Sequence, residues 1–199
     1  TPLILLANPT HIKAGTLKDL AVESRSLSDL AYGSFGNGSS AHFAGEMLLA
    51  ATEIKALHVP YKGSAPAMTD LMGGQVPFSI DTVSAAIPQL KSGKIKAIAV
   101  TTAKRSTLLP DVPTMAESGY PEVNTDTWLV LVAPKGLPPE VKAKLEKALA
   151  ATMADPDTRA KLSAQGLEPG YANSAAVSEL INKELPLMRA IAARANITA

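Results

Sequence analysis

Residues 32–42 read YGSFGNGSSAH, with three glycines and three serines between a short apolar segment and an amphipathic one. Glycine allows several backbone N–H groups to converge on one point, because no Cβ stands in their way. A helix that begins directly after such a turn adds its unpaired N–H groups and the positive end of its dipole. The stretch therefore predicts a strand, an anion-binding turn and a helix in succession, and a carboxylate or a phosphate fits the turn.

The segments around this turn repeat the same arrangement. Short apolar segments alternate with segments of helical periodicity up to about residue 102, which is typical of βα units on a mostly parallel sheet and predicts an α/β layer fold. We expect strands over 3–7, 31–35, 56–61, 76–81 and 95–100. Helices are expected over 16–24 and around 43–51, from a cap at Ser64 to Gly73, and through 85–90, where Pro88 keeps the helix short.

The last third of the chain has a different pattern. A continuous apolar strand is expected over 128–132, and helices then begin near Pro138, Asp155 and Ser174. Pro186 lies inside the last of these helices and predicts a kink or a break there. We expect Trp128, the only tryptophan, to pack in a core more readily than to stack on a ligand.

Composition excludes several classes of function. The 199 residues carry 19 Lys and Arg against 18 Asp and Glu, with no block of like charges that would bind nucleic acid or a membrane surface. The absence of cysteine excludes disulfides, thiol chemistry and Cys-ligated zinc. No segment approaches the roughly 20 apolar residues of a membrane span, and no basic region precedes an apolar signal core. We therefore expect a soluble chain that is mature or trimmed.

Three of the predicted turns belong together. In an open parallel sheet, ligands bind outside the carboxyl ends of the strands, and the turns there carry 34–40, 62–64 and 81–84. They combine small hydroxyls, backbone amides, one cation and one carboxylate, which suits holding a carboxylated small molecule rather than transforming it. The alternative is that they are only tight turns, with Asp81 capping the next helix and His42 satisfied in the interior or at the surface.

Catalytic and cofactor motifs fit the sequence poorly. Residues 36–41 match the dinucleotide pattern G-x-G-x-x-A, but no carboxylate stands near position 61, so only an NADP-like variant that uses Lys62 remains. The alternative function is thus an NADP- or phosphate-binding, oxidoreductase-type domain built on the Gly36-x-Gly38 turn. The common hydrolase and P-loop motifs are missing, and the three histidines lack metal-ligand spacing. We expect no enzyme, no cofactor and no metal.

Four stretches carry a family resemblance in order and spacing, over nearly the whole chain. They are residues 32–42, residues 58–76 (HVPYKGSAPAMTDLMGGQV), residues 97–106 (AIAVTTAKRS) with 109–114 (LPDVPT), and residues 128–134 (WLVLVAP). Together they resemble the extracytoplasmic solute receptors of tripartite tricarboxylate transporters, the Bug proteins.

The resemblance implies a two-lobed periplasmic binding protein, type II-like, with parallel βαβ layers and C-terminal helices. Residues 1–128 would form the second lobe, and residues 129–199 the crossover strand and the helices that pack on the first lobe. The family pattern places a signal sequence and most of the first lobe upstream of Thr1. Without them, the C-terminal helices would cover their apolar faces in an oligomer or a domain swap.

The function implied by the resemblance is transport, not catalysis. Such a receptor captures a small carboxylate in the periplasm, whether a di- or tricarboxylate, an acidic amino acid or an aromatic acid, and delivers it to the membrane permease subunits. Carried over by position, the ligand carboxylate would meet Ser34, Phe35, Gly36, Ser39 and Ser40, and Asp81 with Thr82 would line the same cleft. The turns themselves add Gly38, His42, Lys62 and Gly63 to the candidate ligand-binding residues.

Overall fold

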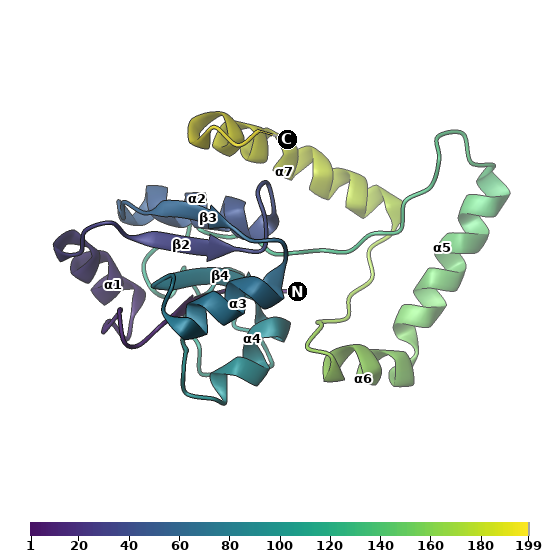
Figure 1. Ribbon diagram of the computed structural model, residues 1–199. Coiled ribbons are helices and arrows are strands. Elements are labelled where there is room, and N and C mark those ends of the chain that lie inside the picture. The colour runs from purple at the N-terminus through teal and green to yellow at the C-terminus, as the bar shows by residue number, and fades with distance from the viewer. Residues whose placement is uncertain (199) are drawn as a thin grey trace. The chain divides into compact units, whose positions relative to one another are not determined.

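The computed structural model describes residues 1–198, which form two units (Figure 1). The first unit comprises Thr1–Thr127 and the end of the chain from Ile191, and the second comprises Trp128–Ala190. The last helix begins in the second unit and ends in the first. The expected division after residue 128 concerns the lobes of a longer receptor and stays a prediction.

The first unit is built on a five-stranded sheet with the strand order β3-β2-β4-β1-β5. Its elements are close to those that the sequence predicts. The strands are β1 (Leu3–Ala7), β2 (Ala31–Ser34), β3 (Leu57–Pro60), β4 (Phe78–Thr82) and β5 (Lys96–Val100). The helices are α1 (Leu17–Glu23), a short 3-10 turn (Ser24–Ser26), α2 (Ser40–Thr52), α3 (Ser64–Gly73) and α4 (Val83–Leu90).

The direction of β1 corrects the expectation of a mostly parallel sheet. β2 is parallel to β3 and to β4, but β1 lies between β4 and β5 and is antiparallel to both. β1 is paired along both edges, so all five of its residues are buried. A continuous apolar run indicates that a strand is buried, but it does not indicate the direction of the strand. The sheet is therefore mixed.

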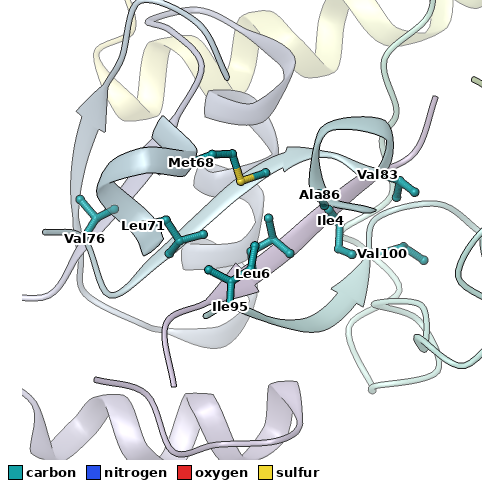
Figure 2. Packing of buried hydrophobic residues seen from close by; sticks show 9 residues of the cluster. All are labelled: Ile4, Leu6, Met68, Leu71, Val76, Val83, Ala86, Ile95 and Val100. Carbon is teal, nitrogen blue, oxygen red and sulfur yellow. The ribbon is translucent and has the colours of Figure 1, made fainter. Parts of the chain in front are cut away.

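Helices cover both faces of the sheet, with α2 on one side of the strands and α3 and α4 on the other (Figure 1). One hydrophobic cluster joins α3 and α4 to the even-numbered residues of β1, because successive side chains of a strand point to opposite faces. Figure 2 shows this cluster: Ile4, Leu6, Met68, Leu71, Val76, Val83, Ala86, Ile95 and Val100. A fully buried side chain of this kind contributes about 1.5–3 kcal/mol, so the cluster holds α3 and α4 against β1 and β5.

The helix starts beside the sheet differ from the prediction at one position. Ser39 caps α2 and Thr82 caps α4, each through a side-chain oxygen that accepts an N–H of the first turn. Gly63, and not Ser64, is the N-cap residue of α3, and it makes no side-chain capping bond. Ser64 is the first residue of the helix, which leaves its hydroxyl free to bond elsewhere.

The second unit consists of helices and irregular chain. α5 (Pro139–Ala154) and α6 (Pro156–Ala164) lie within it, and α7 (Ser174–Ala195) begins in it. Asp155 caps α6, as its position before a proline predicts. The assigned helix α7 is continuous through Pro186, so the expected break is wrong. No helix among the described residues is both long and apolar enough to cross a membrane.

The strand expected over 128–132 is not formed. A β-strand requires a neighbouring strand for its N–H and C=O groups, and no strand of the described chain pairs with this segment. Leu129 and Val132 are 83% and 81% exposed. Trp128 is not in a core: it is 37% exposed, and its indole N–H donates to Glu184 at 3.1 Å.

Candidate functional site

The parallel strands β2, β3 and β4 bring their three following turns to one edge of the sheet, as the sequence predicts. Two hydrogen bonds join these turns to one another. The backbone N–H of Tyr61 donates to the carbonyl of Ser34 at 3.0 Å. The hydroxyl of Ser64 donates to the Asp81 carboxylate at 2.7 Å. The candidate residues of all three turns therefore belong to one region.

The first turn, residues 34–40, is organised around the carbonyl oxygen of Gly36; we call this turn the Gly–Ser loop. That oxygen accepts the hydroxyls of Ser39 at 2.7 Å and Ser34 at 3.1 Å, and the Ser39 N–H at 3.3 Å. Gly36 has a φ of 154° and Gly38 a φ of 67°, conformations that side chains with a Cβ rarely adopt. The two glycines are thus required by the shape of the loop.

The Gly–Ser loop and the first turn of α2 leave several donors unused. The N–H of His42 is held by the Ser39 hydroxyl at 3.3 Å, and that of Gly38 by a His42 ring nitrogen. Over residues 1–198, no hydrogen-bond partner is found for the N–H groups of Asn37, Ser40 and Ala41. Such groups at a helix N-terminus, with the positive end of the helix dipole, attract an anion.

His42 is buried and His58 is half-buried, and both contact the Gly–Ser loop. His42 is 5% exposed, and its Nδ1 accepts the Gly38 N–H at 3.1 Å. Nε2 of His58 lies 2.7 Å from the hydroxyl of Ser34, which is fully buried. Burial lowers the pKa of both imidazoles, and the pKa of His58 falls to about 4 with a further contribution from His42. Both rings are therefore neutral at neutral pH.

The second turn supplies backbone and one exposed cation. Gly63 has a φ of 113°, and Lys62 is exposed. The Tyr61 hydroxyl donates to Asp70 at 2.9 Å, and burial together with Asp70 raises the pKa of Tyr61 to about 12. Among the described residues, no hydrogen bond or ion pair holds the Lys62 ammonium, so the second turn can meet an anion through Lys62.

Phe35, at the start of the first turn, is half-buried.

Asp81 in the third turn is a buried carboxylate and not a helix cap. It is fully buried. One carboxylate oxygen accepts a hydrogen bond from the Ser64 hydroxyl and the other accepts one from the Thr82 N–H, both at 2.7 Å. Thr82 caps α4 in its place. Burial raises the pKa of Asp81, and the hydrogen bonds from Ser64 and Thr82 oppose that rise.

Replacing Asp81 by asparagine should change how stability depends on pH. Because its pKa is raised in the folded state, the folded chain binds the proton more tightly than the unfolded chain, so stability falls as pH rises from the unfolded pKa through the folded one. Asp81→Asn removes this fall, so its unfolding free energy should improve relative to the wild type across the acidic range. Urea unfolding at a series of pH values measures the difference.

Glu117→Gln is the matched control for this measurement, with the opposite sign. The hydrogen bond from Arg105, followed by that of the Thr114 N–H, lowers the pKa of Glu117. The stability that Glu117 contributes to the folded state is present above its unfolded-state pKa and is lost as pH falls through its folded-state pKa. Parallel pH profiles for Asp81→Asn and the wild type would contradict the burial of a charged Asp81.

Sequence reasoning missed two contacts of the Gly–Ser loop. The hydroxyl of Ser40 lies 2.6 Å from that of Thr127, 87 residues away. His58 reaches Ser34 from the neighbouring strand β3. The parallel pairing of β2 with β3 places Tyr32 opposite His58, so the position of His58 could have been inferred from the two strands. No local pattern marks Thr127.

The histidines and carboxylates of this region do not form a metal site. Across the described chain, no group of three or more His, Cys, Asp or Glu residues could hold a metal ion. The arrangement offers backbone N–H groups, hydroxyls and an exposed lysine around a place for an anion. It can bind and orient a carboxylate.

The comparisons with known proteins agree with this geometry. The family model TctC, described as the tripartite tricarboxylate transporter family receptor, matches residues 1–197. The protein BugT of Bordetella pertussis is 34% identical over 169 residues, which is 84% of this chain and 52% of BugT. The chain thus spans about half the length of this relative.

Two solved structures from Rhodopseudomonas palustris have the same fold. The structure of an R. palustris protein with adipate has a TM-score of 0.88 and 33% identity, covering 99% of this chain and 66% of that one. MatC with bound malate has a TM-score of 0.83 and 28% identity, covering 96% and 66%. These likenesses confirm the expected fold class, that of a TctC-type periplasmic binding protein. The chain belongs to the tripartite tricarboxylate transporter receptor family.

Proposed function

We propose that this chain is part of a periplasmic receptor that captures a small carboxylate for a tripartite tricarboxylate transporter. The observation that carries the proposal is the set of unpaired N–H groups of Asn37, Ser40 and Ala41 at the N-terminus of α2. These groups favour a carboxylate, and structures of the same fold hold adipate and malate. The receptor binds its solute without chemical change and passes it to the membrane permease subunits.

The proposed ligand-binding residues fall into two kinds. Ser40, the N–H groups of the Gly–Ser loop, Lys62 and the backbone at Gly63 would face the ligand carboxylate. The others hold these groups in place: Ser34, Gly36, Gly38, Ser39 and His42 shape the loop, and Asp81 with Thr82 fixes the turn beside it. Phe35 would contribute an apolar contact. The proposed solutes are dicarboxylates first, with tricarboxylates, acidic amino acids and aromatic acids as further candidates.

Ligand-induced thermal stabilisation of the full-length protein tests the proposal. We expect at least one of adipate, malate, citrate, glutamate and benzoate to raise the melting temperature. A ligand at 100 times its Kd stabilises the folded state by about 2.7 kcal/mol. No response to any of these anions would overturn the proposal.

Ser39→Ala should weaken the response to the ligand. The substitution removes one hydroxyl from the Gly36 carbonyl and the cap of α2, and N-cap loss costs about 1 kcal/mol by itself. We therefore compare each variant with and without ligand, and expect about tenfold weaker binding, which is about 1.4 kcal/mol less stabilisation at the same concentration. The control is Ser26→Ala, whose hydroxyl also bonds a carbonyl three residues back but lies outside the three turns, in the short 3-10 turn before β2. Equal ligand responses in the two variants would contradict the role of the loop.

A further inference from the structure

Two histidine rings that contact the Gly–Ser loop are stacked on each other. The ring centroids of His42, on α2, and His58, on β3, are 3.6 Å apart with planes at 17°. The His58 ring also lies 4.9 Å from that of Tyr32. At this separation the rings can be neutral together, whereas a charge on one opposes a charge on the other.

His42 fixes one glycine of the loop through an unprotonated nitrogen. Its Nδ1 accepts the Gly38 N–H at 3.1 Å, so the neutral ring carries its proton on Nε2. That Nε2 lies 3.8 Å from a carboxylate oxygen of Glu46. A proton added at Nδ1 would place two N–H groups against each other and break the contact with Gly38.

His58 fixes the other glycine through Ser34. The Ser34 hydroxyl lies 2.7 Å from Nε2 of His58, accepts the Gly36 N–H at 3.2 Å and donates to the Gly36 carbonyl at 3.1 Å. The two stacked rings thus hold Gly36 and Gly38, the two glycines of the Gly–Ser loop, both of which have positive φ. The unpaired N–H of Asn37 lies between them in the chain.

A carboxylate lies against His42, and a guanidinium reaches the same helix. Glu46, also on α2, accepts the Tyr32 hydroxyl at 2.7 Å, and its backbone carbonyl receives the Arg194 guanidinium from α7 at 3.4 Å. Glu46 favours a proton on His42, but burial outweighs it and leaves the pKa of His42 below its ordinary value. At neutral pH both rings are therefore neutral and bonded to the Gly–Ser loop, and acidification adds a proton to this state.

We propose that the stacked His42–His58 pair positions the Gly–Ser loop in a pH-dependent way, so that the loop holds its anion while both rings are neutral and releases it when His42 is protonated at Nδ1. This inference rests on the carboxylate-binding function proposed above. Both histidines are positioning residues, since they act on the ligand only through Gly36, Gly38 and Ser34.

Titration of the ligand-free, full-length protein by NMR tests the positioning. We expect the Gly38 amide resonance to shift with the same midpoint as the His42 imidazole, below the ordinary histidine value of 6.5. A Gly38 amide that does not respond when His42 titrates would overturn the proposal.

Binding of malate and adipate at a series of pH values tests the release. His42→Asn keeps an acceptor for the Gly38 N–H but cannot be protonated, so the fall in wild-type affinity between about pH 7.5 and pH 4.5 should exceed that of the variant roughly three- to tenfold. The ligands' own titration affects both proteins equally. Parallel pH profiles would overturn the inference. If none of the five anions of the thermal screen binds at any pH, the proposed function fails, and the Gly38 titration alone decides whether the pair positions the loop.

Discussion

Replacing Gly45 by alanine should destabilise the first unit severely. An added Cβ would lie 2.2 Å from Cε2 of Tyr32 and 2.7 Å from its hydroxyl oxygen, far inside van der Waals contact. The Tyr32 ring cannot yield easily, because it is fully buried, stacks on Phe78 and bonds to Glu46. Helix α2 would have to shift off β2. We expect a loss of about 3 kcal/mol in unfolding free energy, by analogy with overpacked cores, measured by urea unfolding.

Gly73→Ala is the matched control for this substitution. Gly73 is also helical, and an added Cβ there meets nothing within 4 Å. Gly73 is the last residue of α3 and has no positive φ, so alanine fits there without strain and this variant should be neutral or slightly more stable. If Gly45→Ala behaved like Gly73→Ala, the close approach of α2 to β2 would be wrong.

The elements of the first unit could be predicted because their signals are local. Alternating apolar segments and the glycines that end α3 each act within a few residues of the boundary they set. The direction of β1 could not be predicted in this way. It depends on the pairing of β1 with β4 and β5, which begin more than 70 residues later. An apolar run carries no information about strand direction.

The second unit shows where a local signal misleads. The apolar run at 128–132 has the composition of a buried strand, but a strand forms only where another strand pairs with it, and the described chain offers none. Pro186 removes a hydrogen-bond donor, yet α7 is assigned as continuous through it. For the run at 128–132, the partner strand decides the outcome, and the sequence window does not contain it.

The candidate site shows the same difference between features set by local sequence and features set by distant contacts. The three turns and their residue types follow from strand order and glycine content, so the set of candidate residues could be chosen from the sequence. The roles within it depend on contacts across the sheet. His42 was expected to be either a ligand donor or an interior residue, and the contacts with Gly38 and His58 place it in the interior. Ser64 was expected as a cap and instead binds Asp81.

Gly36→Ala should abolish most ligand binding while leaving the fold intact. At a φ of 154° the backbone is accessible essentially only to glycine, and residues forced into such regions cost of order 1–3 kcal/mol. Space is not the obstacle, because an added Cβ would meet only the Tyr61 carbonyl at 3.6 Å, an ordinary contact. The loop would relieve the strain by rotating the peptide groups around Gly36, and its carbonyl would leave Ser34 and Ser39.

That rearrangement weakens anion binding, because the N–H groups of the loop no longer point to one place. A loss of about 2–3 kcal/mol in binding corresponds to roughly 30- to 150-fold weaker affinity. Calorimetric titration of the full-length protein with the best carboxylate of the thermal screen measures this loss of affinity. Gly15→Ala is the control, because an added Cβ at Gly15 meets nothing within 4 Å and Gly15 has no positive φ. An affinity in Gly36→Ala equal to that of Gly15→Ala would show that the anion is bound elsewhere. A fall in both stability and affinity would point to a loop that supports the fold as well as the ligand, because Gly36 also holds Ser39, the cap of α2.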